Sequence, residues 1–146
     1  MTTLDEVLYD ERPEDDQHPD GVYQWPGRSV PASELQRARD GGWTVGVVQL
    51  GQAASDKAMF KAFQRDLDFP DWFGHNWDAL VDALSDWAED APRLLVLEDV
   101  HGDKDAVEAL LSVMDLFSIE MSASHGCVVV LTAPRPLDGP VSLSLT

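Results

Sequence analysis

The segment PDWFGHNWDALVDALSDW, residues 70–87, carries the clearest structural pattern in the chain. Asn76 is a typical helix N-cap residue, and apolar side chains recur after it at intervals of three and four. This periodicity predicts a helix from Trp77 to about Glu89, which Pro92 ends. Residues 68–75 are predicted to form the loop before it. The apolar side of the helix consists of Trp77, Leu80, Val81, Leu84, Trp87 and Ala88.

The opposite side of this predicted helix is acidic. Asp78, Asp82 and Asp86 follow one another at a spacing of four residues, so they form one stripe. No lysine or arginine occurs between residues 66 and 90 to balance them. Like charges at this spacing destabilise a helix by about 0.2–0.5 kcal/mol per pair, so the stripe weakens the isolated helix. Composition alone leaves two interpretations open: a solvated face of an acidic protein, or a face that binds a cationic partner.

Strands and helices alternate on both sides of this segment. Valine-rich or continuous apolar runs predict the strands, and capping residues mark where helices begin. The predicted elements are a strand at 43–50, a helix from the N-cap residue Ser55 to about Leu67, a strand at Leu94–Leu97, a helix from Asp103 to Ser124, and a strand at Cys127–Thr132.

This alternation is typical of a parallel sheet with helices packed on it. We therefore predict an α/β fold: a small single domain in which a three-stranded parallel sheet packs against helices, with an N-terminal extension. A length of 146 residues agrees with one domain. Cys127 begins an apolar strand and is predicted to lie in the core. No glycine-rich turn leads into a helix in the manner of a phosphate-binding loop.

The two ends of the chain fall outside the main alternation. The first twenty residues contain eight acidic residues and one basic residue, which predicts a flexible acidic tail. A short edge strand at 22–25 and a helix at 34–40 are predicted next. The predicted segments are thus the acidic tail (1–20), the N-terminal extension (21–42), the main domain (43–132) and a C-terminal tail (133–146).

The composition indicates which kinds of partner the chain can bind and in which cellular compartment it is expected. The chain has 10 Lys and Arg against 27 Asp and Glu, a formal net charge of −17. Nucleic acids and anionic membranes bind clustered basic residues, so neither is expected as a partner. The single cysteine excludes an internal disulfide and paired-cysteine metal sites. We find no secretory signal and no membrane span in the sequence, and expect a cytoplasmic protein.

Large aromatic residues accompany the acidic stripe. Trp72 and Phe73 precede the predicted helix, and Trp77 and Trp87 lie within it. Aromatic side chains beside directed charge are typical of binding hot spots. The combination favours a surface for a cationic protein.

Residues 70–87 resemble the signature of the barstar family. The shared pattern is a proline, an acid, two aromatic residues and a glycine, followed by an asparagine, an apolar residue and Asp-Ala-Leu. A second aspartate and a tryptophan come later. Pro92–Glu98 and His125–Cys127 are similar to later parts of the pattern, so that the resemblance extends over about 43–132.

The resemblance implies a barstar-like fold and an intracellular inhibitor rather than an enzyme. Such an inhibitor blocks the cationic active site of a small basic ribonuclease, barnase, in a one-to-one complex. It needs no cofactor, no metal and no small-molecule substrate. The physical basis is plain, because carboxylates can replace phosphate oxygens in charge-assisted hydrogen bonds.

The resemblance also implies which residues touch the ribonuclease. Asp82 corresponds to the aspartate that enters the phosphate site, and Asp78 to a second central acid. Trp72 takes the place of a tyrosine that covers the catalytic histidine, and Glu120 is the nearest candidate for a third acid. The predicted partner-binding residues are Trp72, Gly74, Asn76, Trp77, Asp78, Val81, Asp82, Ser85, Trp87 and Glu120.

The sequence departs from the family pattern near this face. His75 stands where the best-known member of the family has an acid. Val81 replaces a tryptophan, Ala83 a cysteine and Asp86 a glycine. These departures leave a second hypothesis open, in which the chain is a barstar-like binding module for a different basic protein.

A metal-dependent hydrolase is a further alternative. His75, Asp78 and Asp82, together with the aspartates between residues 66 and 71, are residue types that bind cations, although the histidines lack a metal-binding spacing. The pair Glu98–Asp99 ends a predicted strand, where ligands of α/β proteins bind, or it is a surface carboxyl pair.

Overall fold

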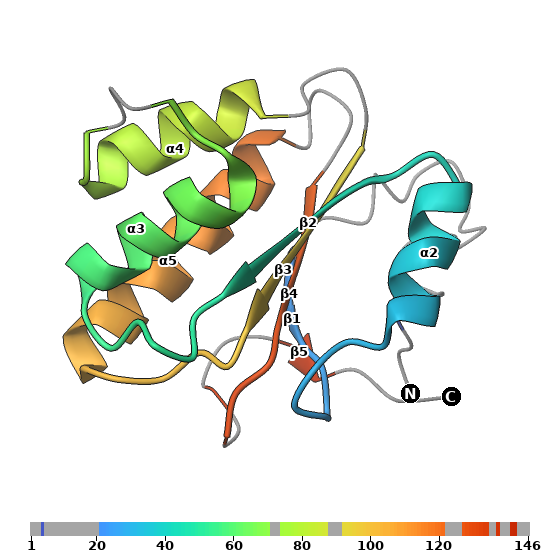
Figure 1. The fold of residues 1–146 in the computed structure, drawn as a ribbon, viewed down its shortest axis with the longest axis horizontal. Coiled ribbons are helices and arrows are strands. Elements are labelled where there is room, and N and C mark those ends of the chain that lie inside the picture. The colour runs from blue at the N-terminus through green and yellow to red at the C-terminus, as the bar shows by residue number, and fades with distance from the viewer. Residues whose placement is uncertain are drawn as a thin grey trace.

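The computed structural model describes residue 4 and residues 21–70, 74–87, 92–121, 127–134, 137 and 141–142. In these parts of the chain, five parallel strands form one sheet in the order β2-β3-β4-β1-β5, with α2 on one face and α3, α4 and α5 on the other (Figure 1). The elements are β1 (Gly21–Gln24), α2 (Ala32–Asp40), β2 (Thr44–Gln49), α3 (Asp56–Leu67), α4 (Trp77–Asp86), β3 (Arg93–Glu98), α5 (Lys104–Met121), β4 (Cys127–Leu131) and β5 (Val141–Ser142).

The parallel α/β fold is confirmed, but the prediction of three strands is wrong. Besides β2, β3 and β4, the sheet contains β1 and β5. The predicted edge strand β1 pairs with β4 along its whole length and with the two-residue β5 on its other side. The sequence pattern missed β5 because two residues are too few to show a periodicity. Residues of the predicted N-terminal extension therefore belong to the sheet itself.

The other predicted elements are confirmed, with small differences at their ends. The Ser55 hydroxyl accepts a hydrogen bond from the Ala58 N–H (3.3 Å) and caps α3, as predicted. Asp68 ends this helix in a left-handed conformation, with φ 55°. Within the described residues α5 ends at Met121, and the predicted end at Ser124 lies outside them.

Two apolar clusters lie on the two faces of the sheet. Leu95 and Leu97 of β3 belong to the larger cluster, beneath α3, α4 and α5. Leu94 and Val96 belong to the smaller one, beneath α2. Side chains of a strand point alternately to its two faces, which explains why β3 is a continuous apolar run. Cys127 is buried in the larger cluster, as predicted.

Leu4 belongs to the smaller cluster and is only 2% exposed. Trp25, Val30 and Trp43 are buried members of the same cluster. The composition of the predicted acidic tail gives no sign of this contact. The remainder of that tail, residues 1–3 and 5–20, lies outside the described residues.

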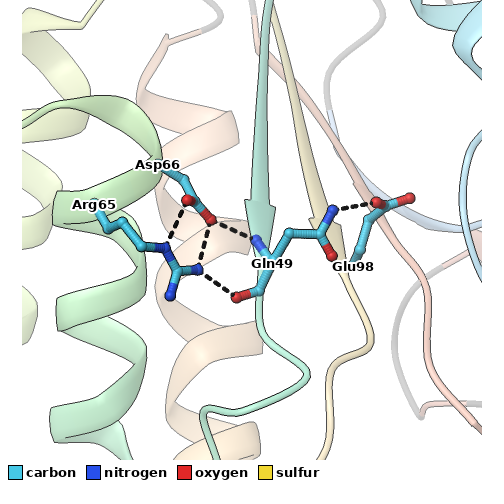
Figure 2. Close-up of polar contacts among 4 residues, drawn as sticks. All are labelled: Gln49, Arg65, Asp66 and Glu98. Atoms are coloured by element: carbon cyan, nitrogen blue, oxygen red, sulfur yellow. Dashed lines mark hydrogen bonds and ion pairs between the residues drawn. The ribbon is translucent and has the colours of Figure 1, made fainter.

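A polar network joins α3 to the end of the sheet (Figure 2). Asp66 accepts hydrogen bonds from Arg65 Nε (2.7 Å) and Nη2 (2.8 Å), and from the backbone N–H of Gln49 (2.8 Å). Arg65 Nη2 also donates to the Gln49 carbonyl (3.0 Å). The Gln49 side chain donates to Glu98 Oε1 (2.6 Å), and Glu98 Oε2 accepts from the Val30 N–H (2.8 Å). Because β2 is an edge strand, this network satisfies backbone groups that would otherwise invite another chain to pair.

We expect Asp66→Asn to lower the free energy of unfolding by about 1 kcal/mol near pH 7. The Arg65 side chain, helped by the Gln49 N–H, holds the pKa of Asp66 below its usual value. A depressed folded-state pKa stabilises the protein above the unfolded pKa of about 3.9, and this contribution is lost as the pH falls through the folded-state value. Arg65 is 59% exposed, so solvent screening keeps the ion-pair part small.

Urea unfolding of wild type and Asp66→Asn across a pH series would check this expectation. The two stabilities should differ at neutral pH and converge at pH values below about 4. A difference that stays constant down to acid pH would show that the carboxylate charge is not what stabilises this end of β2.

Candidate functional site

Helix α4 is fixed at its start by a side-chain cap. Asn76 Oδ1 accepts a hydrogen bond from the Ala79 N–H (2.8 Å), which confirms Asn76 as the N-cap residue. Leu80 and Leu84 are completely buried in the larger cluster. These contacts set the rotation of the helix and direct its opposite side to solvent.

The predicted acidic stripe lies on that outward side. Asp78, Asp82 and Asp86 are all exposed. Across the parts of the chain that the structure describes, none of the three carboxylates takes part in an ion pair or a hydrogen bond. The stripe is therefore a row of solvated, unneutralised charges on a rigid helix.

A buried arginine ends α4. Arg93, the first residue of β3, is 1% exposed. Its Nε donates to the Trp87 carbonyl (2.7 Å) and its Nη2 to the Ser85 carbonyl (3.3 Å). A cation at a helix C-terminus satisfies the last carbonyls and interacts favourably with the helix dipole. The helix consequently ends at Asp86, before the predicted end at Glu89, which lies outside the described residues.

Trp87 packs onto the sheet. A Cβ atom added to Gly46 of β2 would lie 2.5 Å from Trp87 Cζ2 and 2.7 Å from Leu67 Cδ2. The indole ring thus occupies the space that a side chain at position 46 would need. Trp87 holds the end of α4 against β2, and its predicted contact with a partner stays a prediction.

A groove of about 360 Å³ lies between α4 and α5. Trp77, at its α4 side, makes an edge-to-face contact with Phe60 of α3, with ring centroids 4.7 Å apart. Leu116 of α5 is 61% exposed. Among the described residues, no other large apolar side chain is exposed. We refer to this feature as the α4–α5 groove; its lining residues are Trp77, Asp78, Val81 and Asp82 from α4, and Val113, Leu116 and Phe117 from α5.

The structure brings part of the predicted contact set together. Trp77, Asp78, Val81 and Asp82 share the groove, and Gly74 and Asn76 are exposed just before the helix. The Ser85 hydroxyl donates to the Val81 carbonyl (2.8 Å), within α4. Trp72 and Phe73 lie outside the described residues, and of Glu120 only the place in α5 is described. Sequence reasoning did not find Val113, Leu116 and Phe117, because only the packing of α5 on α4 brings them to this face.

Two residues of the metal hypothesis, His75 and Asp66, are engaged in other contacts. His75 Nε2 lies 2.8 Å from Gln64 Oε1, and Asp66 is held by Arg65. Glu98 is buried with both carboxylate oxygens hydrogen-bonded, and Asp99 is exposed in a left-handed conformation, with φ 63°. In the described parts of the chain, no three His, Cys, Asp or Glu side chains are grouped so as to hold a metal ion. These contacts lend that hypothesis no support.

The chain also matches a known protein family. Residues 43–132 match the family with the description Barstar (barnase inhibitor). The chain belongs to the barstar family. The barstar match runs from just before β2 to just after β4, and so includes α4 and α5 with the groove between them. The resemblance inferred from residues 70–87 is thereby confirmed.

A comparison with curated proteins found no match to this chain. No helix among the described residues is both long enough and apolar enough to cross a membrane.

Proposed function

We propose that this chain is a protein inhibitor of a small basic ribonuclease of the barnase type. It binds one ribonuclease through α4 and the loop before it, and its carboxylates occupy the cationic active site. The exposed, unneutralised acidic stripe on α4 carries this proposal. Membership of the barstar family supports an inhibitor rather than a catalyst.

The stripe suits a site built for phosphate. A ribonuclease binds the phosphates of RNA with Arg, Lys and His side chains, and carboxylates can accept the same charge-assisted hydrogen bonds. Residues four apart on a helix have Cβ atoms about 5–6 Å apart, so Asp78 and Asp82 can engage neighbouring cationic groups of one cleft. Asp82 is proposed as the carboxylate in the phosphate site, with Asp78 beside it.

The way α4 is held favours tight binding. The Asn76 cap, the Arg93 guanidinium and the buried Leu80 and Leu84 fix both ends and the inner side of the helix. A surface that is already ordered loses little conformational entropy when a partner binds. The net charge of −17 adds long-range attraction that speeds the encounter with a basic protein.

An RNA-cleavage assay with purified barnase tests the proposal. We expect cleavage to stop once the chain and the enzyme are present in equal amounts, and we expect the chain alone to leave RNA intact. Undiminished cleavage at a large excess of the chain would reject barnase as the target and leave the hypothesis of a different basic partner. RNA hydrolysis by the chain alone, dependent on a divalent metal, would favour the metal hypothesis.

A further inference from the structure

We propose that the α4–α5 groove receives an apolar side chain of the partner, flanked by basic residues of that same partner. The inference rests on the proposed function, because it takes the partner to be a basic protein that docks on α4. It adds an apolar contact on α5, separate from the predicted acid Glu120, and states the chemistry that the partner must present there.

The walls of the groove differ in character. The α4 wall carries Asp78 and Asp82, whereas the α5 wall consists of Val113, Leu116 and Phe117. The carboxylates of Asp78 and Asp82 attract a cation of the partner to the α4 wall. The same cation placed against these three apolar side chains would lose its water without finding a hydrogen-bond acceptor among them, and an unpaired buried charge is costly. An apolar group is the chemistry that fits the α5 wall.

Exposure of Leu116 supports an apolar occupant. This side chain is 61% exposed while its neighbour Phe117 is fully buried. Covering Leu116 and the open part of the groove removes apolar surface from water, which favours binding in proportion to the area covered. A central apolar anchor next to directed charges is also the usual composition of an interface hot spot.

Charge decides between the possible occupants. A second copy of this chain has the same net charge of −17, and the first twenty residues of the chain are themselves acidic. Asp78 and Asp82 at the groove, and the exposed Asp115 beside Leu116, repel both. Lysine or arginine on either side of an apolar residue reverses this repulsion, so the occupant belongs to a basic partner.

Two synthetic peptides test the groove without knowledge of the natural partner. They are acetyl-Arg-Arg-Leu-Arg-Arg-amide and the same peptide with serine in place of leucine. We expect the leucine peptide to bind the full chain about fivefold more tightly at moderate salt, as apolar burial requires. It should also shift the methyl NMR signals of Val113 and Leu116. Equal binding of the two peptides, or unshifted methyl signals, would overturn the inference.

Three variants assign the preference to the groove. Leu116→Ser should bind both peptides equally, and its melting temperature should stay near that of wild type because the side chain is mostly exposed. Asp82→Ala should weaken the binding of both peptides to the same extent, and the leucine peptide should still bind more tightly than the serine peptide. Ser112→Ala is the matched control on the exposed side of α5, and it should behave as wild type. A leucine preference that survives Leu116→Ser would contradict the proposed contact.

The barnase assay separates this inference from the proposed function. Inhibition of barnase together with equal peptide binding would leave the proposed function standing and reject the apolar contact. A leucine preference in a chain that does not inhibit barnase would reject barnase as the target and support the groove as the contact for another basic protein.

Discussion

Asp82→Ala should abolish tight binding to the partner ribonuclease while leaving the protein as stable as wild type or slightly more stable. In the complex, Asp82 is proposed to neutralise cationic groups of the enzyme, and its removal leaves those groups buried without a counter-charge. Such a loss costs about 2–5 kcal/mol or more of binding free energy and acts mainly through faster dissociation. This range is a general one for buried charge pairs, complexes of barnase included, and is not particular to this chain.

The same substitution has the opposite effect on folding. In the free protein, Asp82 is exposed and follows Asp78 and precedes Asp86 at a spacing of four. Alanine relieves the repulsion along the stripe and has a higher helix propensity, so the gain in stability is at most about 1 kcal/mol. Calorimetric unfolding and surface-plasmon-resonance kinetics together would measure both effects.

Asp86→Ala is the matched control for Asp82→Ala. It removes the same residue type from the same stripe at a position outside the proposed contact set. We expect a slower, salt-dependent association and a dissociation rate close to wild type. If Asp82→Ala also keeps the wild-type dissociation rate, the stripe is only a solvated surface and the proposed contact residues are wrong.

Gly46→Ala should lower the free energy of unfolding by about 1–3 kcal/mol, the usual cost of forcing extra atoms into a packed core. The new methyl group would lie 2.5 Å from Trp87 Cζ2 and 2.7 Å from Leu67 Cδ2. Neither neighbour can yield easily, since the indole ring is rigid and both side chains pack against the larger apolar cluster. Thermal and urea unfolding would measure the loss.

A double-mutant cycle identifies the ring as the cause. Trp87→Leu alone leaves a cavity and is destabilising, but it frees space next to Gly46. Gly46→Ala combined with Trp87→Leu should therefore cost clearly less than the sum of the two single substitutions. Gly74→Ala is the matched control, because its methyl group would lie 3.6 Å from the nearest atom and should change stability by less than about 0.5 kcal/mol. Additive losses would show that Trp87 does not fill the space above Gly46.

Features that depend on nearby residues could be predicted from the sequence. The Asn76 cap and the periodicity after it located the start of α4 and its acidic face, because both signals lie within a few residues of the helix. The match to the barstar family confirmed the interpretation of the same segment. The end of α4 was missed because Arg93, which ends the helix, lies beyond it in the chain.

Contacts between distant segments could not be predicted in this way. Val81 and Leu116 line the same α4–α5 groove only because both helices pack on the same face of the sheet. The glycine at position 46 of the valine-rich strand gave no indication that the ring of Trp87 packs over it. The two-residue strand β5 is too short to show a pattern, and only its pairing with β1 identifies it.

The position of β1 in the sheet also governs when the molecule can be completed during synthesis. Gly21 of β1 pairs with Val128, and Tyr23 pairs with Val141 on the other side. The ribosome releases β1 first among the strands, yet both of its neighbours emerge last. Until then, β1 has no partner strand in the described sheet, and its pairing must wait for the closure of a very long loop, which is a slow step in folding. The sheet therefore cannot be completed until the last part of the chain has been made.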